Sequence, residues 1–273
     1  MMAPKILVIM VLYQQHFSQS PSFEILMKAI HEGKIQLILY DNSQTAQEVQ
    51  SFVNESIHYY HNSANPGLAT AYNYALARAQ KSIRYFVTLD QDSRLPTTYF
   101  DTILNIEWTE ELVAAVPMIY DQNKQISPVY ADHYINRQFK SVDHSQIVSR
   151  RIMAINSGAV FSTVFLKKMG GFNLNFPLDF LDHWIFWTIF QLKKSVFVLS
   201  EQMEHDLSVL DYKKVSVSRY QSILKAENQF YQTYDKEMLT QHRKQLFLRT
   251  IKQFLTVKNR KIWRLTLRSF VEI

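Results

Sequence analysis

Uninterrupted apolar runs alternate with amphipathic or alanine-rich segments over the first third of the chain. The apolar runs predict strands at residues 5–13, 35–40, 57–60 and 85–89. The segments between them predict helices at residues 22–32, 44–54 and 68–80. Runs without polar alternation are typical of parallel strands covered on both faces. The pattern therefore predicts βαβ units around a mainly parallel sheet, which is an α/β fold.

The rest of the chain has a more mixed pattern. Further apolar runs predict strands at residues 112–118, 155–161 and 196–199, and a helix at residues 180–192. Residues 119–150 are polar and loop-rich, and helical spacing dominates from residue 216 onward. We expect one nucleotide-binding α/β domain over residues 1–235 and a basic amphipathic helical extension over residues 236–273.

Composition and length narrow the class of protein. The chain has 273 residues, 47% hydrophobic and 20% charged, which is a globular balance. The absence of cysteine excludes disulfides, thiolate metal sites and a cysteine nucleophile. No apolar run approaches the roughly 20 residues that span a bilayer, and no small-residue cleavage site follows the first run. We therefore expect a cytoplasmic protein.

The positive charge is concentrated near the C-terminus. Nine Lys or Arg and no Asp or Glu lie between His242 and Arg268, interleaved with large apolar residues. This composition is typical of a basic amphipathic helix on an anionic membrane surface. The alternative is a helix packed on the rest of the protein with a solvated basic face. We expect no nucleic-acid partner, because no recognised nucleic-acid module accompanies the basic residues.

Polar residues follow the predicted strands where those strands end. Tyr13 follows the first strand, Asp41 the second, and Asp90-Gln91-Asp92 the strand at residues 85–89. Open α/β sheets bind ligands at this edge. Clustered carboxylates repel each other unless a cation lies between them, and Mg²⁺ commonly uses one or two carboxylates together with substrate phosphates. The triplet therefore predicts a divalent cation site, with a solvated, Asp-capped turn as the alternative.

The order of the motifs VLYQQ, YDNS, NPGLATAYNYAL, TLDQDSRLP, NSGAVFS, GGFN and LDFLDHW resembles the inverting family-two glycosyltransferases of GT-A fold, over roughly residues 5–230. The resemblance is strongest to bacterial rhamnosyltransferases of polysaccharide assembly. It implies metal-dependent transfer with Mg²⁺ or Mn²⁺, L-rhamnose from dTDP-rhamnose as the donor, and a saccharide or undecaprenyl-diphosphate-linked acceptor at the cytoplasmic face of the plasma membrane. The alternatives are a UDP-hexose donor or a non-catalytic GT-A-like binding subunit, and a homodimer stays open.

The resemblance also implies roles for residues at matching positions. The nucleotide-sugar donor would be bound by Tyr13, Asp41, Asn65, Gly67, Asn73, Asp90 and Arg219. The metal would be held by Asp90, Asp92 and His205, and the acceptor would be bound by Asn156, Ser157, Gly158, His183 and Trp184.

Inversion at a sugar carbon requires a general base on the face opposite the leaving diphosphate. The family places this Asp at the start of an apolar helix, where Asp182 matches best and Asp179 is the nearby competitor. A helix cap is the structural alternative for Asp182. Trp184 stands where a second acidic residue usually follows in the family, and this departure keeps the choice between the two carboxylates open.

Overall fold

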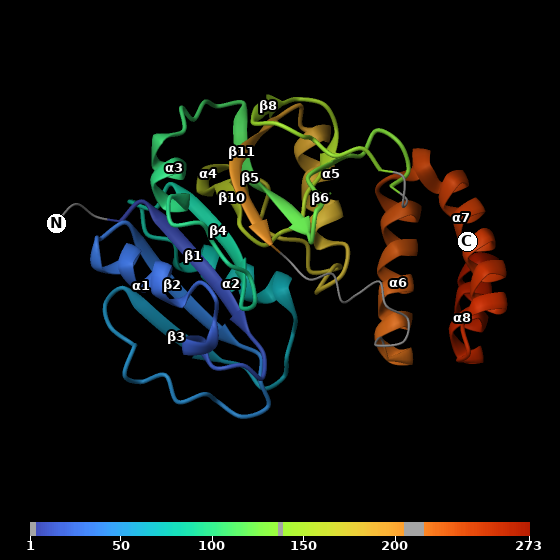
Figure 1. Cartoon of the computed structure of the whole chain (residues 1–273), viewed down its shortest axis with the longest axis horizontal. Coiled ribbons are helices and arrows are strands. Elements are labelled where there is room, and N and C mark those ends of the chain that lie inside the picture. The colour runs from blue at the N-terminus through green and yellow to red at the C-terminus, as the bar shows by residue number, and fades with distance from the viewer. Residues whose placement is uncertain (1–3, 136–138, 205–215) are drawn as a thin grey trace.

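A nine-stranded sheet forms the centre of the computed structural model, which describes residues 4–135, 139–204 and 216–273 (Figure 1). Its strands are β1 (Ile6–Leu12), β2 (Ile35–Asp41), β3 (Ile57–His61), β4 (Tyr85–Asp90), β5 (Leu112–Asp121), β6 (Lys124–Ser127), β8 (Gln146–Val148), β10 (Ala159–Ser162) and β11 (Ser195–Glu204). The order is β3-β2-β1-β4-β10-β5-β11-β8, with β6 paired to β5. A separate small sheet pairs β7 (Val129–Tyr130) with β9 (Ile152–Met153).

The sheet is mainly parallel, as predicted. Strands β3, β2, β1 and β4 run parallel to one another, and β11 runs parallel to β5. Strand β10 is antiparallel to both β4 and β5, so β4 and β5 point the same way. The carboxyl ends of these parallel strands therefore meet at one edge of the sheet.

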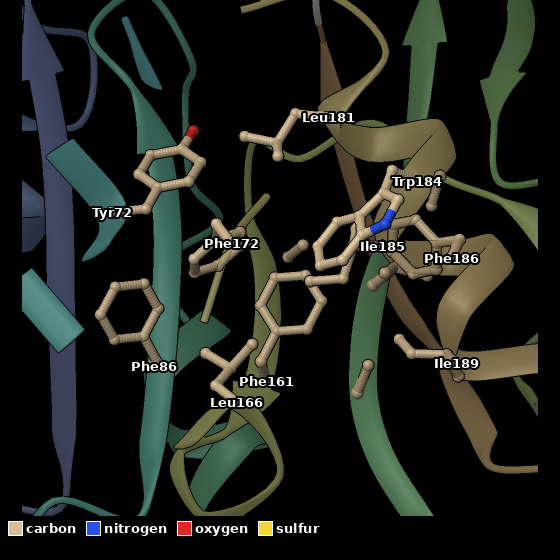
Figure 2. Packing of buried hydrophobic residues seen from close by; sticks show 14 of the residues in the cluster. Tyr72, Phe86, Phe161, Leu166, Phe172, Leu181, Trp184, Ile185, Phe186 and Ile189 are labelled. Atoms are coloured by element: carbon tan, nitrogen blue, oxygen red, sulfur yellow. The ribbon is translucent and has the colours of Figure 1, made fainter. Parts of the chain in front are cut away.

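Helices cover both faces of this sheet. They are α1 (Phe23–His31), α2 (Leu68–Arg78), α3 (Tyr99–Asn105), α4 (Thr163–Lys168) and α5 (Leu181–Gln191), with a short 3-10 turn at η1 (Phe17–Gln19). Alternate residues of β1 enter different cores: Leu7 and Ile9 pack with α2, α4 and α5, while Val8 and Met10 pack with α1 and α3. Burial on both faces explains why the strands read as continuous apolar runs. Figure 2 shows the first of these cores.

Two sequence predictions about elements are wrong. Residues 44–54 form turns and irregular backbone instead of a helix. The Asp41 carboxylate accepts the backbone N–H groups of Ser43 and Gln47, and the Asn54 side chain accepts those of Ser56 and Ile57. Such side-chain acceptors compete with helical hydrogen bonds. In the second case, the strand predicted from residue 155 begins only at Ala159, because residues 156–158 make a turn.

Three helices complete the chain: α6 (Val217–Thr233), α7 (Leu239–Thr256) and α8 (Arg260–Val271), with a 3-10 turn at η3 (Lys236–Met238). In Figure 1 they stand beside the sheet domain, with α6 nearest to it. Helix α6 packs Phe230 and Tyr231 into the sheet domain, while Tyr220 and Leu224 pack against α7 and α8. The division of the chain at residue 235 stays a prediction. No helix in the described ranges is long and apolar enough to cross a membrane.

Candidate active site

The ends of β1 and β4 are tied together at the carboxyl edge of the sheet. The Tyr13 backbone N–H donates to Gln91 Oε1 at 2.7 Å, and Gln91 Nε2 donates to the Tyr13 carbonyl at 3.1 Å. The Tyr13 side chain stays 45% exposed. An exposed aromatic ring beside a strand end can stack on a planar ligand ring. The structure thus leaves Tyr13 available for the nucleobase role predicted from the sequence.

The Asp41 carboxylate is fully buried at the end of β2. It accepts hydrogen bonds from the Tyr59 hydroxyl at 2.6 Å and from the backbone N–H groups of Ser43 and Gln47 at 2.9 and 3.2 Å. Its visible role is to hold the loop after β2, and contact with a nucleobase stays a prediction. The neighbouring Asn42 Oδ1 and both polar side-chain atoms of Gln47 are buried and have no hydrogen-bond partner within the described part of the chain. The sequence analysis did not single out these amide groups.

The Asp90-Gln91-Asp92 turn is held against the turn that precedes β10. The Asp90 backbone N–H donates to Ser157 Oγ at 3.0 Å, and Ser157 Oγ lies 2.6 Å from Ser93 Oγ. Thr88 Oγ1 donates to the Asn156 carbonyl at 2.5 Å. The predicted metal motif and the predicted acceptor segment are therefore adjacent, although they lie more than sixty residues apart in the chain.

Gly158 completes this turn in a conformation that favours glycine. Its φ is +72°, and an added Cβ would lie 2.7 Å from Met203 Sδ. Met203 in turn lines a cavity of about 600 Å³ beside the Asp90 turn. The cavity is lined by Arg94, Leu95, Pro96, Tyr120, Gln122, Asn123, Gln202, Met203 and Glu204. Its amide, carboxylate, guanidinium and phenol groups can all hydrogen-bond the hydroxyls of a saccharide.

The predicted metal ligands are only partly described by the structure. Asp90 is half-buried and Asp92 is exposed at the edge of the sheet, while His205 lies outside the described residues. Among residues 4–135, 139–204 and 216–273, no group of three His, Asp or Glu side chains is close enough to hold a metal ion. Carboxylate oxygens are the ligands that Mg²⁺ and Mn²⁺ prefer, so the donor chemistry of Asp90 and Asp92 fits either ion.

The segment at residues 65–67 packs on the segment that carries the candidate bases. Asn65 and Gly67 both have positive φ, 46° and 92°. A Cβ on Gly67 would lie 2.3 Å from the Pro177 carbonyl oxygen, to which the Ala69 N–H donates at 3.2 Å. Only glycine allows this approach. Gly67 thereby fixes α2 against the loop that leads into Asp179 and Asp182.

Asn73 has a structural role in these contacts. Its Oδ1 accepts the Phe172 N–H at 2.8 Å, and its Nδ2 donates to the Phe172 carbonyl at 2.7 Å. The amide is thus engaged with the Gly170-Gly171-Phe172 turn. Its predicted position beside the nucleotide remains a prediction.

The two candidate bases differ in their surroundings. Asp179 forms a bidentate ion pair with Arg219 at the start of α6, with Arg219 Nη2 2.6 Å from Asp179 Oδ1. Burial raises the pKa of the Asp179 carboxyl above its ordinary value, although Arg219 lowers it. Asp182 lies in the first turn of α5, where one oxygen accepts the His183 backbone N–H at 2.8 Å. Because Asp179 is paired with Arg219, Asp182 is the better candidate for the base. The same pair occupies the Arg219 guanidinium, which was predicted to bind the nucleotide sugar.

His183 and Trp184, predicted to contact the acceptor, have packing roles in this structure. The His183 ring stacks on Phe180 at a centroid distance of 4.4 Å, and burial lowers the pKa of its imidazole. Trp184 is 8% exposed, and Figure 2 shows its indole among the apolar side chains of the core. The packing of His183 and Trp184 therefore fixes the first turn of α5, which carries Asp182.

A mainly parallel sheet with a carboxylate turn and an exposed tyrosine at its carboxyl edge is typical of a nucleotide-binding α/β fold of GT-A-like kind. Residues 8–168 match glycosyl transferase family 2, and the chain belongs to that family. No curated protein sequence matches the chain significantly.

Solved structures resemble this one in fold. A structure titled S. aureus TarS 1–349 in complex with UDP-GlcNAc has a TM-score of 0.61 at 15% identity, covering 98% of this chain and 81% of that one. GalNAc-T7 with UDP, GalNAc and Mn²⁺ has a TM-score of 0.61 at 10% identity, covering 85% of this chain and 49% of that one. The chain thus spans about half the length of the GalNAc-T7 structure.

Proposed function

We propose that the protein is a metal-dependent inverting glycosyltransferase that moves L-rhamnose from dTDP-rhamnose to a saccharide or lipid-linked saccharide in cell-surface polysaccharide assembly. The observation that carries the proposal is the adjacency of the Asp90–Asp92 turn and the Asn156–Gly158 turn at the carboxyl edge of the sheet. The similar structures contain UDP and UDP-GlcNAc, which favours a UDP-hexose as the competing donor. A non-catalytic binding subunit would not need Asp90, Asp92 and Asp182 together.

Each residue has a defined part in the proposed reaction. Tyr13 stacks on the nucleobase, and Asp90 and Asp92 are the residues that would hold Mg²⁺ or Mn²⁺. The cation supplies positive charge that stabilises the departing diphosphate. Asp182 accepts the proton of the acceptor hydroxyl while that oxygen forms its bond to the anomeric carbon. The bond from that carbon to the diphosphate oxygen breaks on the opposite face, which inverts the configuration.

The acceptor is proposed to bind beside the Asn156–Gly158 turn and in the cavity that shares Met203 with it. The cavity opens next to Arg94, just after the Asp90–Asp92 turn, so a saccharide there would lie close to the donor. Its polar lining suits neutral sugar hydroxyls.

Calorimetry with dTDP-rhamnose and UDP-GlcNAc, with Mn²⁺ and with EDTA, tests the donor and the metal together. In calorimetry we expect one donor to bind in Mn²⁺, and we expect Asp92→Asn to weaken donor binding only when metal is present. When sugar transfer is measured, EDTA should abolish it. Asp143→Asn, an exposed carboxylate distant in sequence, is the matched control and keeps donor binding. Full transfer by Asp92→Asn in EDTA contradicts the metal role. Failure of both donors to bind contradicts the function.

We also propose that α7 and α8 dock on an anionic membrane surface. Large apolar side chains of α7 are exposed, including Phe247 at 48%, Phe254 at 50% and Leu255 at 73%. Lys and Arg lie between them along the chain, and neither α7 nor α8 contains an acidic residue. Apolar groups flanked by cations are the composition that binds anionic interfaces.

Co-sedimentation with phosphatidylglycerol vesicles tests this docking. The wild type should sediment and should be released as salt rises, because salt screens the attraction. Replacing Leu248 and Leu255 together with Ser should reduce sedimentation. Replacing Val164 and Leu174, which are exposed to a similar degree on the sheet domain, should not. Equal sedimentation of the two double variants rules out α7 as the membrane contact.

A further inference from the structure

Helix α2 carries a buried tyrosine hydroxyl that no described residue hydrogen-bonds. Tyr72 is 0% exposed, and its Oη is shielded from solvent without a partner among the described residues. Leaving a buried hydroxyl unpaired costs folding free energy, and a phenylalanine of the same shape would avoid that cost. An unpaired group of this kind in a native fold therefore calls for a function.

The surroundings of Tyr72 fix where its hydroxyl points. Gly67 holds the start of α2 against Pro177, and Asn73 holds the next turn against Phe172. The Tyr72 ring packs edge-on against Phe172 at a centroid distance of 5.0 Å. Figure 2 shows the ring in the core, with its hydroxyl directed away from Phe86 at the end of the cluster. The side chain is thus held rigidly with its polar atom at the margin of the core.

The carboxylates of Asp90 and Asp182 are the charged groups that act on this hydroxyl. Burial raises the pKa of the Tyr72 hydroxyl well above its ordinary value, and Asp90 and then Asp182 raise it further. The phenol is therefore protonated and can donate a hydrogen bond. The carboxylates of Asp90 on β4 and Asp182 on α5 therefore both lie within electrostatic range of this hydroxyl.

We propose that Tyr72 Oη donates a hydrogen bond to a hydroxyl of the transferred sugar, which binds between Asp90 and Asp182. This inference rests on the proposed function. Two carboxylates disfavour an anion such as phosphate between them, whereas a sugar hydroxyl can accept from Tyr72 and donate to a carboxylate. The sugar thereby completes the hydrogen bonding that the protein leaves unfinished, and Tyr72 becomes a determinant of sugar specificity.

Tyr72→Phe in the full chain separates this role from a structural one. The variant should melt at or above the wild-type temperature, because it loses only an unpaired buried hydroxyl. Its affinity for the nucleoside diphosphate alone should equal that of the wild type. Its affinity for the sugar nucleotide that the wild type binds best, chosen from dTDP-rhamnose and UDP-GlcNAc, should fall by roughly two- to tenfold, as expected for one neutral hydrogen bond.

Tyr134→Phe is the matched control. The Tyr134 hydroxyl donates to Glu227 Oε1 at 3.2 Å, far along the chain from the site. This variant should melt at a lower temperature and bind the sugar nucleotide normally. The inference is overturned if Tyr72→Phe binds the sugar nucleotide as the wild type does, or if it loses stability as Tyr134→Phe does. If the wild type binds neither sugar nucleotide, the proposed function itself fails, and with it the inference.

Discussion

The identity of the general base can be decided by comparing Asp182→Asn with Asp179→Asn. Asparagine keeps an oxygen for the His183 N–H that Asp182 accepts at 2.8 Å, so the first turn of α5 should persist. It cannot take a proton at neutral pH. We expect Asp182→Asn to fold normally, to bind the nucleoside diphosphate normally, and to transfer sugar about 10²–10⁴-fold more slowly.

Asp179→Asn should show the opposite result, a loss of stability with transfer retained. The substitution removes the charge partner of Arg219, in a pair whose side chains are 12% and 32% exposed. Breaking a fully buried pair costs about 3–5 kcal/mol, and an exposed pair contributes less than about 1 kcal/mol. For this half-buried pair we expect a loss of about 1–3 kcal/mol, or roughly 2–6 °C in Tm for a chain of this size.

Thermal unfolding and single-turnover transfer, measured on both variants below their melting temperatures, distinguish the alternatives. If Asp179→Asn abolishes transfer while folded and Asp182→Asn retains it, the base is Asp179, which lies three residues earlier, just before α5. If Asp182→Asn transfers within tenfold of the wild type, the assignment of a general base to this helix start is wrong.

Two further predictions follow from particular contacts. Gly67→Ala should destabilise the protein by more than Gly170→Ala. Both residues have positive φ, but of the two only Gly67 has a backbone atom, Pro177 O, 2.3 Å from the added Cβ. Equal losses of stability in chemical denaturation would contradict the close contact. Burial lowers the pKa of His242 from 6.5 to about 4, although Glu227 raises it. Between these two pH values the unfolded chain binds a proton at His242 more readily than the folded chain does. The stability of the protein therefore falls as the pH drops from about 6.5 towards 4. The loss between pH 7 and pH 4.5 should be about 2 kcal/mol, and it should shrink in His242→Gln but not in the exposed control His58→Gln; an unchanged pH profile for His242→Gln refutes the assignment.

The sequence was sufficient for the fold class because apolar runs report burial directly. Strands β1, β2 and β4 are covered on both faces and carry almost no polar residue, so their pattern is unambiguous. The loop after β2 was mispredicted because its spacing suits a helix, whereas the Asp41 carboxylate captures the backbone N–H groups that a helix needs. The antiparallel insertion of β10 has no signal in the hydrophobic pattern.

The positions of Tyr13 and the Asp90–Asp92 triplet at the carboxyl edge of the sheet were predictable because both follow strand ends, while their roles stay predictions. It was not predictable where function depends on contacts across the chain. The pairing of Arg219 with Asp179 joins residues forty positions apart, and Tyr72 reads as an ordinary core residue in an alanine-rich helix. Only the three-dimensional structure shows that its hydroxyl lacks a partner among the residues described.

The two-sided packing of α6 has a consequence for how the protein folds. One face of the helix completes the core beneath α5, and the other forms a second apolar cluster with Leu246 of α7 and Ile262 of α8. Glu227 on the same helix is paired through both oxygens with Arg249 of α7. Removing the chain after residue 235 would therefore expose an apolar face of α6 to water. It would also leave the buried carboxylate of Glu227 without its partner Arg249. The C-terminal helices and the sheet domain should melt as a single cooperative unit, and neither should persist as an independent fragment.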